Sequence, residues 1–331
     1  MKVFVSRLIP DTGLQLLKQA GLQTTVWTED RQITQQELIE QAKQHDALLC
    51  MGSDKMDAHF LTQCQHLKVI AQFSVGYDNV DVAVATRLGI PFGNTPDVLS
   101  DATADVAFLL MLAVSRKAFF MHKRIISGEW GTYRPTLNLG MELKNKTLGI
   151  FGLGRIGMEL AKRCRGAYNM NVIYHNRSHN VQAEQELQAR KVSFEELLAQ
   201  SDVLSVHVAL SPETEGKFNA DVFRKMKPSS IFINTARGKI HQEQDLIQAL
   251  NEGWIWGAGL DVTNPEPMLP DNPLLSMPNA AVLPHIGSAT VQARNDMARL
   301  AATNIIAGLH GKRLPHCINP EVYKKDKSIS N

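Results

Sequence analysis

The feature that most constrains the fold is a glycine-rich segment near the middle of the chain. Residues 148–157 read LGIFGLGRIG, which places a G-x-G-x-x-G pattern after an apolar strand pattern and before the helical run Met158 to Cys164. Gly152 permits the tight turn, Gly154 lets a pyrophosphate approach the backbone, and Gly157 lets helix and strand pack closely. The phosphates would meet the N-terminus of the helix. Because strand, turn and helix follow in the order the motif needs, we predict a dinucleotide site, not a glycine-rich turn without a ligand.

Strand and helix patterns alternate on both sides of this motif. They begin at Lys2–Val5 in the first ninety residues and restart at Thr147, where the second series has a six-strand, doubly wound pattern. The 331 residues are too many for one typical core. We therefore predict an α/β protein with two doubly wound parallel-sheet domains around a cleft: a flavodoxin-like substrate domain and a Rossmann dinucleotide-binding domain.

The domain boundaries follow from proline, glycine and helix patterns. Residues 90–96 contain two prolines and a glycine and precede a long apolar helix from about Ser100. A further helix, about Thr290 to Leu309, leads into a final segment at Leu314 to Pro320. Because the first series is one helix short, we expect this C-terminal piece to pack on the N-terminal domain. The substrate domain would comprise residues 1–98 and 290–331, the dinucleotide domain residues 99–289, and the two crossings would form hinges.

Composition excludes several classes of protein. A net charge of +2 without clustered Lys and Arg argues against nucleic acid or an anionic membrane as partner. The N-terminal residues reach the charge of Arg7 before they could form the apolar stretch of a signal peptide, and the longest apolar run, Ala107 to Val114, is too short to span a membrane. We therefore expect a cytoplasmic protein. The scattered cysteines argue against disulfides and against a zinc site, and we expect no metal; they are Cys50, Cys64, Cys164 and Cys317.

The end of the second strand of the dinucleotide domain bears on the choice of cofactor. An NAD site usually has an Asp or Glu there to hold the ribose 2′-OH, but this chain has His175, Asn176, Arg177 and Ser178. Arg177 can pair with a 2′-phosphate, and Ser178 or Asn176 can donate to its oxygens. We therefore predict that NADP(H) is preferred. The alternative is that Arg177 and His175 are solvated loop residues and that NAD(H) is also accepted.

Three segments at the carboxyl ends of predicted strands carry Arg237, Glu266 and His285. Taken singly, they are most simply a surface cation, a carboxylate in a rigid turn and a structural histidine. Together they supply a carboxylate clamp, an anionic partner and a titratable acid, which is the minimal set for reducing a keto acid beside a nicotinamide.

The chain resembles the D-isomer-specific 2-hydroxyacid dehydrogenase family over nearly its whole length. Within that family it is most similar to glyoxylate/hydroxypyruvate reductases. The resemblance is carried by residues 235–238, 259–267 and 284–290, and by 74–81 and 94–99 in the first half. It implies that Arg237 binds the substrate carboxylate and keto oxygen, while His285 donates a proton to the keto oxygen as hydride arrives. Glu266 would orient His285 and favour its charged form.

The resemblance also implies contacts to substrate and cofactor outside this set. Backbone N–H groups near Val75 and Gly76 would hold the other side of the carboxylate, and Asp261 would anchor the nicotinamide amide. The remaining cofactor-binding residues would be Thr103, Arg155, Ile156, Thr235, Ala236 and Gly287.

The activity that follows is NADPH-preferring reduction of glyoxylate and hydroxypyruvate to 2-hydroxy acids. The alternatives are a reductase of a bulkier keto acid such as 2-ketogluconate, and an NAD(H)-sensing binding protein similar to the corepressors of this family. Tyr133 stands where the glyoxylate/hydroxypyruvate reductases carry a tryptophan that reaches the partner's pocket, which bears on the exact substrate. We expect a homodimer formed through the aromatic segment Phe119 to Met141, unless that segment packs within its own subunit.

Overall fold

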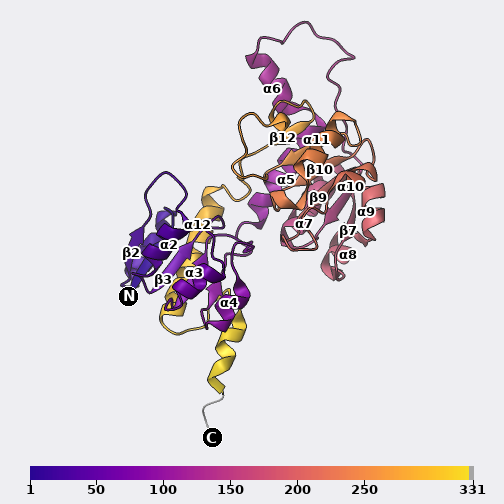
Figure 1. Cartoon of the computed structure of the whole chain (residues 1–331). Coiled ribbons are helices and arrows are strands. Elements are labelled where there is room, and N and C mark those ends of the chain that lie inside the picture. Colours follow the sequence, from indigo (N-terminus) through magenta and orange to yellow (C-terminus); the bar gives the residue numbers. More distant parts are fainter. Residues whose placement is uncertain (328–331) are drawn as a thin grey trace. The chain divides into compact units, whose positions relative to one another are not determined.

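The computed structural model describes residues 1–327, which form two compact units (Figure 1). The N-terminal unit contains residues 1–99 and the chain from Ala289 onward, and the C-terminal unit is Ser100–Ser288. Residues 328–331, the end of the predicted substrate domain, lie outside the described residues. Both units are built on all-parallel sheets, so the predicted fold class of two parallel-sheet α/β domains is confirmed.

The N-terminal unit has a five-stranded sheet in the order β2-β1-β3-β4-β5, the flavodoxin-like order. Its strands are β1 (Lys2–Val5), β2 (Gln23–Val26), β3 (Ala47–Cys50), β4 (Val69–Gln72) and β5 (Phe92–Gly93). Its helices are α1 (Asp11–Gln19), α2 (Gln35–Ala42), α3 (Ala58–Gln63), α4 (Val82–Arg87), α12 (Val291–Leu309) and the 3-10 helix η3 (Pro320–Lys327).

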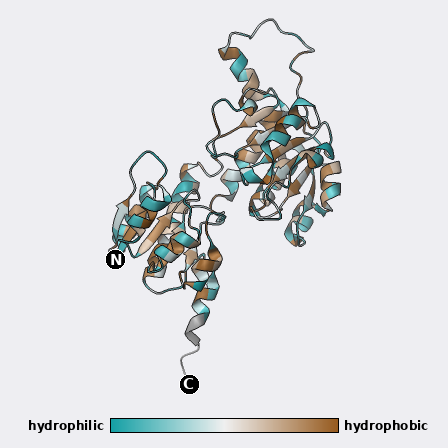
Figure 2. Ribbon diagram, in the orientation of Figure 1, coloured by the Kyte–Doolittle hydropathy of each residue, from teal (hydrophilic) through white to brown (hydrophobic). Residues whose placement is uncertain are grey.

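Alternate residues of these strands face different helices, as the period of two in a strand requires. Phe4, Leu48 and Ile70 join one buried cluster with apolar residues of α2, α3 and α4. The neighbouring residue Val69 is in close contact with Gly308 of α12, where an added Cβ would lie 2.5 Å from the Val69 side chain. Helix α12 therefore covers the second face, together with α1, and Figure 2 shows the apolar colour on the strands of this sheet.

The chain after α12 remains bound to this unit through backbone and amide groups. Cys317 forms an antiparallel bridge with Gly93, and the Phe92 N–H donates to Oδ1 of Asn319 at 2.8 Å. The side chain of Asn304, in α12, donates to the carbonyl oxygen of Asn94 at 3.0 Å. The segment that follows α12 thus continues the packing that the helix begins.

The C-terminal unit has a seven-stranded sheet in the order β12-β11-β10-β9-β6-β7-β8. Strands β8-β7-β6-β9-β10-β11 follow the Rossmann order 3-2-1-4-5-6, and β12 extends the sheet beyond β11. The predicted count of six strands was therefore wrong. The strands are β6 (Thr147–Phe151), β7 (Asn171–His175), β8 (Arg190–Lys191), β9 (Val203–Val206), β10 (Ile231–Asn234), β11 (Gly257–Leu260) and β12 (Ala280–Val282). The apolar patterns of the sequence do not predict β8, because it is two polar residues at a sheet edge. They also do not predict β5, which is equally short, or β2 and α2, which consist mostly of polar residues.

Helices cover both faces of this second sheet. Helices α5 (Ser100–Ser115), α7 (Arg155–Tyr168) and α8 (Val181–Leu187) contribute to one buried cluster, and α9 (Phe194–Gln200), α10 (Ala220–Arg224) and α11 (Glu243–Asn251) to the other. The 3-10 helices η1 (Gly238–Ile240) and η2 (Pro273–Leu275) follow β10 and precede β12. Helix α6 (Ala118–Ile126) and the loop after it extend from the body of this unit (Figure 1).

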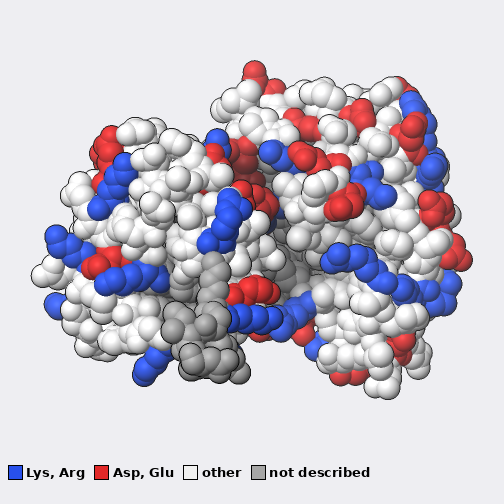
Figure 3. All heavy atoms as spheres, turned by 60° about the horizontal axis from the view of Figure 1, so that its bottom comes forward, with Lys and Arg blue, Asp and Glu red and all other residues white. Residues whose placement is uncertain are grey.

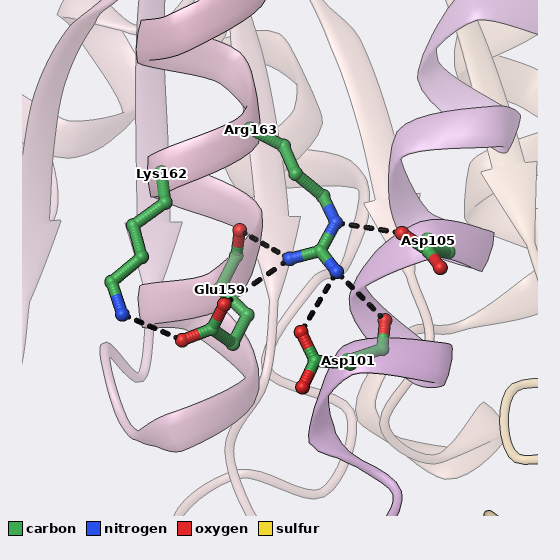
Figure 4. A network of polar contacts seen from close by, with 5 residues as sticks. All are labelled: Asp101, Asp105, Glu159, Lys162 and Arg163. Carbon is green, nitrogen blue, oxygen red and sulfur yellow. Dashed lines mark hydrogen bonds and ion pairs between the residues drawn. The ribbon is translucent and has the colours of Figure 1, made fainter. Parts of the chain in front are cut away.

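An ionic network joins α5 to α7 (Figure 4). Arg163 of α7 binds Asp105 through Nε at 2.6 Å and Asp101 through Nη2 at 2.9 Å, and it also contacts Glu159 one turn earlier. Asp101 lies in the first turn of α5, where a carboxylate also favours the helix dipole. The network therefore fixes the start of α5 on the helix that follows the glycine-rich loop.

Surface charge is mixed on the face drawn in Figure 3, where Lys and Arg alternate with Asp and Glu. Among residues 1–327, no helix has the length and apolar character needed to cross a bilayer.

Candidate active site

Three neighbouring parallel strands of the C-terminal unit end at the same sheet edge and deliver the predicted catalytic residues. Arg237 follows β10, Glu266 follows β11, and His285 follows β12; β11 pairs with both of the others. Because parallel strands place their carboxyl ends together, the structure brings these segments to one place although they are far apart in sequence.

His285 and Glu266 form a direct pair. Nδ1 of His285 lies 2.5 Å from Oε1 of Glu266, and the second carboxylate oxygen is 3.5 Å from the Thr263 N–H. Partial burial raises the pKa of Glu266, but the hydrogen bond and charge of His285, the Thr263 N–H and the charge of Arg237 outweigh it and hold that pKa below its usual value. Glu266 is therefore an ionised acceptor, and His285 donates its Nδ1–H to it, which leaves Nε2 for other chemistry.

Asp261 holds the loop that carries His285. Its Oδ1 accepts from the Ile286 N–H at 2.8 Å and its Oδ2 from the Gly287 N–H at 2.7 Å, and only 1% of the residue is exposed. Burial raises the pKa of Asp261 despite these two donors. His285 itself has a φ of 53°, in the left-handed region that a histidine adopts rarely. The two bonds from the residues after it maintain this conformation; the predicted contact of Asp261 with a nicotinamide amide remains a prediction.

The turn that carries Arg237 is fixed by Asn234, a residue that the sequence analysis did not single out. The Asn234 amide donates to the carbonyl oxygen of Arg237 at 2.8 Å and to Nδ1 of His241 at 3.1 Å, and its Oδ1 accepts from the Ala236 N–H at 3.0 Å. His241 is 2% exposed, and burial lowers its pKa to about 4. It is therefore neutral near pH 7 and can accept this hydrogen bond.

Gly238 brings the Arg237 turn against the segment that leads to Glu266. A Cβ at this position would lie 1.9 Å from the carbonyl oxygen of Thr263, so a side chain has no space there. The close approach of the two backbones places the guanidinium near enough to Glu266 for its charge to lower the pKa of that carboxyl. The glycine of the predicted segment thus has a steric role that its sequence position alone does not show.

The glycine-rich loop between β6 and α7 has the form that a dinucleotide requires. Gly152 has a φ of 94° and little space, because a Cβ there would lie 2.5 Å from Val208. Gly154 is the N-cap of α7, where no side chain caps the first turn and an added Cβ would meet open space. Gly157 packs against Ile150. An uncapped helix N-terminus beside open space fits a pyrophosphate, with Arg155 and Ile156 in the first helical turn.

The four polar residues at the end of β7, His175 to Ser178, fall into two groups: two make contacts within the unit and two are exposed. Asn176 accepts from the Leu153 N–H at 2.7 Å and donates to the Leu153 carbonyl at 3.0 Å, so its amide is already engaged within the glycine-rich loop. His175 stacks on Phe151, which contradicts its alternative interpretation as a solvated residue. Arg177 and Ser178 are exposed.

Lys191, on β8, is a cation that the sequence analysis missed at this end of β7. Its Nζ donates to the Arg177 carbonyl at 3.2 Å. The sequence alone does not place Lys191 at this site, because its position depends on the pairing of β7 with β8, which sets it beside Tyr174.

Thr103 and Thr235, two further predicted cofactor residues, are buried in the same unit. Thr103 of α5 lies beside Gly287, where an added Cβ would be 3.4 Å from its hydroxyl and 2.9 Å from Oδ2 of Asp261. The Thr235 hydroxyl lies 3.5 Å from Nδ1 of His207, at the end of β9. Both threonines thus border the strand ends that carry the catalytic segments.

Val75 and Gly76, the predicted carboxylate-binding residues, belong to the N-terminal unit. They follow β4 and are half-buried at the carboxyl edge of its sheet. Their role in binding a substrate remains a prediction.

The doubly wound sheet, the glycine-rich loop and the strand-end Arg, Glu and His define a nicotinamide-dependent dehydrogenase. Residues 108–287 match the model of the D-isomer specific 2-hydroxyacid dehydrogenase, NAD binding domain. The chain is 44% identical to a glyoxylate reductase of Pyrococcus furiosus over 98% of its own length and 96% of that protein's.

Solved structures agree with this relationship. A glyoxylate reductase from Paecilomyes thermophila aligns with a TM-score of 0.86 at 33% identity, over 96% of this chain and 98% of that one. An NADPH-dependent glyoxylate/hydroxypyruvate reductase from Sinorhizobium meliloti, solved with NADP and malonate, aligns with a TM-score of 0.83 at 31% identity, over 97% of each chain. The chain belongs to the D-isomer-specific 2-hydroxyacid dehydrogenase family. It is an NAD(P)-dependent oxidoreductase, as its sequence predicted.

Proposed function

We propose that this enzyme reduces the small 2-keto acids glyoxylate and hydroxypyruvate to 2-hydroxy acids and prefers NADPH. The observation that carries the proposal is the His285–Glu266 pair, 2.5 Å apart at the strand edge that also carries Arg237. A proton donor, a carboxylate that stabilises its charged form and a fork-shaped cation are the groups that carbonyl reduction of an α-keto acid needs.

In the proposed mechanism, Arg237 binds the substrate's carboxylate and keto oxygen. Glu266 holds the Nδ1–H of His285, so the proton for the keto oxygen comes from Nε2 of the imidazolium. Glu266 offsets the positive charge before transfer and keeps the ring in one orientation. A bound nicotinamide would supply the hydride, with its dinucleotide held at Gly152, Gly154 and the first turn of α7. Backbone N–H groups of Val75 and Gly76 would donate to the substrate carboxylate.

The preference for NADPH rests on Arg177. It is exposed just beyond β7, where an NAD enzyme usually has a carboxylate, and Ser178 beside it is exposed as well. Lys191 adds a second positive charge near the Arg177 backbone. We assign the 2′-phosphate to Arg177 and Ser178 but leave Asn176 out of this role, because Leu153 already occupies its amide. The NADP bound in the structure of the Sinorhizobium relative supports the same choice.

The proposed substrates come from the relatives. The Pyrococcus and Paecilomyes proteins are named glyoxylate reductases, and the Sinorhizobium protein is named a glyoxylate/hydroxypyruvate reductase. These identities favour a small keto acid over a bulky one such as 2-ketogluconate.

We further propose that the enzyme is a homodimer whose contact includes α6 and the loop after it. Helix α6 has no buried residue, and this segment exposes large apolar side chains: Ile125 (52%), Ile126 (75%), Trp130 (79%), Tyr133 (86%), Leu137 (50%) and Leu139 (61%). Figure 2 shows the apolar colour at the end of α6. The alternative, that the segment packs within its own subunit, does not account for these exposed side chains, whereas a subunit contact would bury them.

We propose that the enzyme works in the cytoplasm, a reducing compartment in which cysteines remain as free thiols. All four are free, and Cys50, Cys64 and Cys164 are buried.

One panel of 2-keto acids, assayed with NADPH and with NADH, tests the proposal. We expect the highest kcat/KM for glyoxylate or hydroxypyruvate with NADPH, and His285→Ala should abolish most turnover while retaining NADPH binding. Turnover with 2-ketogluconate above that with glyoxylate would select the bulky-acid alternative. NADPH or NADH binding without turnover on any keto acid would select the binding-protein alternative.

A further inference from the structure

The turn after β4 has all of its carbonyl groups fixed by donors of its own unit. The Ser74 carbonyl accepts from the Thr95 N–H at 2.9 Å, and the Val75 carbonyl accepts from Nδ2 of Asn94 at 2.8 Å. The Gly76 carbonyl accepts from two side chains, Nε2 of Gln72 at 2.6 Å and the Ser74 hydroxyl at 2.7 Å. Three consecutive carbonyl oxygens are thus held in place.

The N–H groups of the same turn are in the opposite situation. Within residues 1–327, the backbone N–H groups of Val75 and Gly76 have no hydrogen-bond partner in the structure. Successive backbone N–H groups left without acceptors form a site for an anion, because each donates to an oxygen and none adds a negative charge. Each N–H shares a planar peptide group with the carbonyl of the residue before it. The Ser74 carbonyl, held by Thr95, therefore sets the Val75 N–H, and the Val75 carbonyl, held by Asn94, sets the Gly76 N–H. The Gly76 carbonyl, held by Gln72, fixes the next peptide group and so closes the turn on its other side.

Gln72 and Asn94 are the two amides that fix this turn, and both are buried. Gln72 is the last residue of β4 and is 0% exposed, and Asn94 is 4% exposed. Oε1 of Gln72 accepts from Nδ2 of Asn79 at 3.0 Å, which orients its Nε2 toward the Gly76 carbonyl. Asn94 is in turn held by Asn304 of α12, which donates to its carbonyl at 3.0 Å.

We propose that Asn94, through the Val75 carbonyl, and Gln72, through the peptide group that follows Gly76, are positioning residues for the Val75 and Gly76 N–H groups. These N–H groups bind an anion, which by the proposed function is the substrate carboxylate. A neutral amide suits this task because it binds a carbonyl without bringing a charge near the anion. A carboxylate at either position has the same shape but cannot donate, and it would repel both the carbonyl and the anion.

The test compares Gln72→Glu, Gln72→Met and Asn94→Asp with Gln23→Glu, a control on the exposed first residue of β2. Four quantities are measured: KM and kcat for glyoxylate, the KM of NADPH, and the affinity for malonate by calorimetry with NADPH present. Malonate tests anion binding without turnover. The melting temperature of each variant shows whether it is folded.

We expect the KM for glyoxylate and the Kd for malonate to rise by about tenfold or more in the three variants, equivalent to the loss of about 1.4 kcal/mol. The change in kcat should stay within about threefold, and the KM of NADPH should match the wild-type value. A merely structural role would lower kcat and NADPH affinity together with substrate affinity, or would leave folded variants with unchanged KM and malonate affinity; either result overturns the proposal.

Failure of the proposed function is distinguishable from failure of this inference. If wild-type enzyme reduces no 2-keto acid, the substrate assignment is wrong, while weaker malonate binding in the three variants would still support the positioning role. If wild-type enzyme turns over glyoxylate and the variants equal it, the positioning role is wrong and the proposed function stands.

Discussion

Nδ1 of His285 donates to a carboxylate oxygen of Glu266 at 2.5 Å, and this contact links the charge states of the two residues. The hydrogen bond and charge of His285 help to hold the pKa of Glu266 below its usual value. In the proposed mechanism the same contact stabilises positive charge on the ring. The carboxylate therefore stays ionised until the pH falls below the usual range of a glutamate. The contribution of the ionised Glu266 to the free energy of unfolding is fully present at neutral pH, and it is lost as the pH falls through this lowered pKa.

Glu266→Gln should lower kcat for glyoxylate reduction at pH 7 by roughly 10²-fold and move the optimum to more acidic pH. The amide retains a hydrogen-bonding oxygen but lacks the charge that stabilises the imidazolium. The measurement is a pH–rate profile of the variant beside wild type and Glu252→Gln, an exposed control. An unchanged optimum with full activity would show that Glu266 does not influence the proton donor.

Arg237→Lys should raise the KM for glyoxylate by about tenfold to a hundredfold at similar NADPH affinity. Lysine keeps the positive charge, but a point charge cannot reproduce the two parallel hydrogen bonds of a guanidinium fork. Steady-state kinetics with saturating NADPH measure the effect. An unaltered KM would indicate that charge alone is sufficient, and that the fork is not the reason for an arginine at this strand end.

Gly238→Ala should destabilise the C-terminal unit by more than about 2 kcal/mol and remove most activity. The added Cβ would lie 1.9 Å from the Thr263 carbonyl oxygen, so the Arg237 turn or the Glu266 segment has to move. Urea denaturation and the initial rate measure the two effects. Gly166→Ala is the matched control, because its Cβ would meet nothing within 4 Å and alanine favours a helix. A Gly238→Ala enzyme of wild-type stability would contradict the close backbone approach.

Arg177→Ala should raise the KM of NADPH by about tenfold or more and leave that of NADH almost unchanged. The guanidinium would pair with the 2′-phosphate, which only NADPH carries. The control is Arg224→Ala, an exposed arginine of α10 that stacks over Trp254. Equal effects on both cofactors would remove the structural argument for NADPH.

The parts of this molecule that the sequence predicts are those with a periodic or motif signal. Apolar strands followed by Gly152, Arg237, Glu266 and His285 could be placed at strand ends, because the parallel α/β pattern determines which edge those ends share. The family resemblance supplied the roles. Two-residue strands such as β8 carry no periodicity, so the nearness of Lys191 to Arg177 could not be inferred.

The supporting amides were invisible for a different reason. Asn234, Gln72 and Asn94 are single polar residues at strand ends, and a sequence does not show whether such an amide faces solvent or a backbone carbonyl. Asn176 illustrates the same limit: it has the chemistry to bind a phosphate, but the fold directs its amide to Leu153.

His241 makes the stability of the C-terminal unit depend on pH. Burial lowers its pKa from 6.5 to about 4, so the unfolded chain binds a proton more readily than the folded one between these values. Stability is then constant above about pH 6.5 and falls as the pH drops toward 4, by at most about 3 kcal/mol from this residue. Protonation would also place a donor where Nδ1 now accepts from Asn234, which supports the Arg237 turn.

His241→Gln should flatten this dependence, because glutamine does not titrate and its oxygen can still accept from Asn234. Urea midpoints at pH 7, 5.5 and 4.5 measure it, beside wild type and the exposed control His59→Gln. The loss of stability between pH 7 and 4.5 should be smaller in His241→Gln than in either reference protein. It should not vanish, since burial also lowers the pKa of His207 to about 4. Parallel pH curves for the three proteins would mean that His241 does not couple folding to protonation in this range.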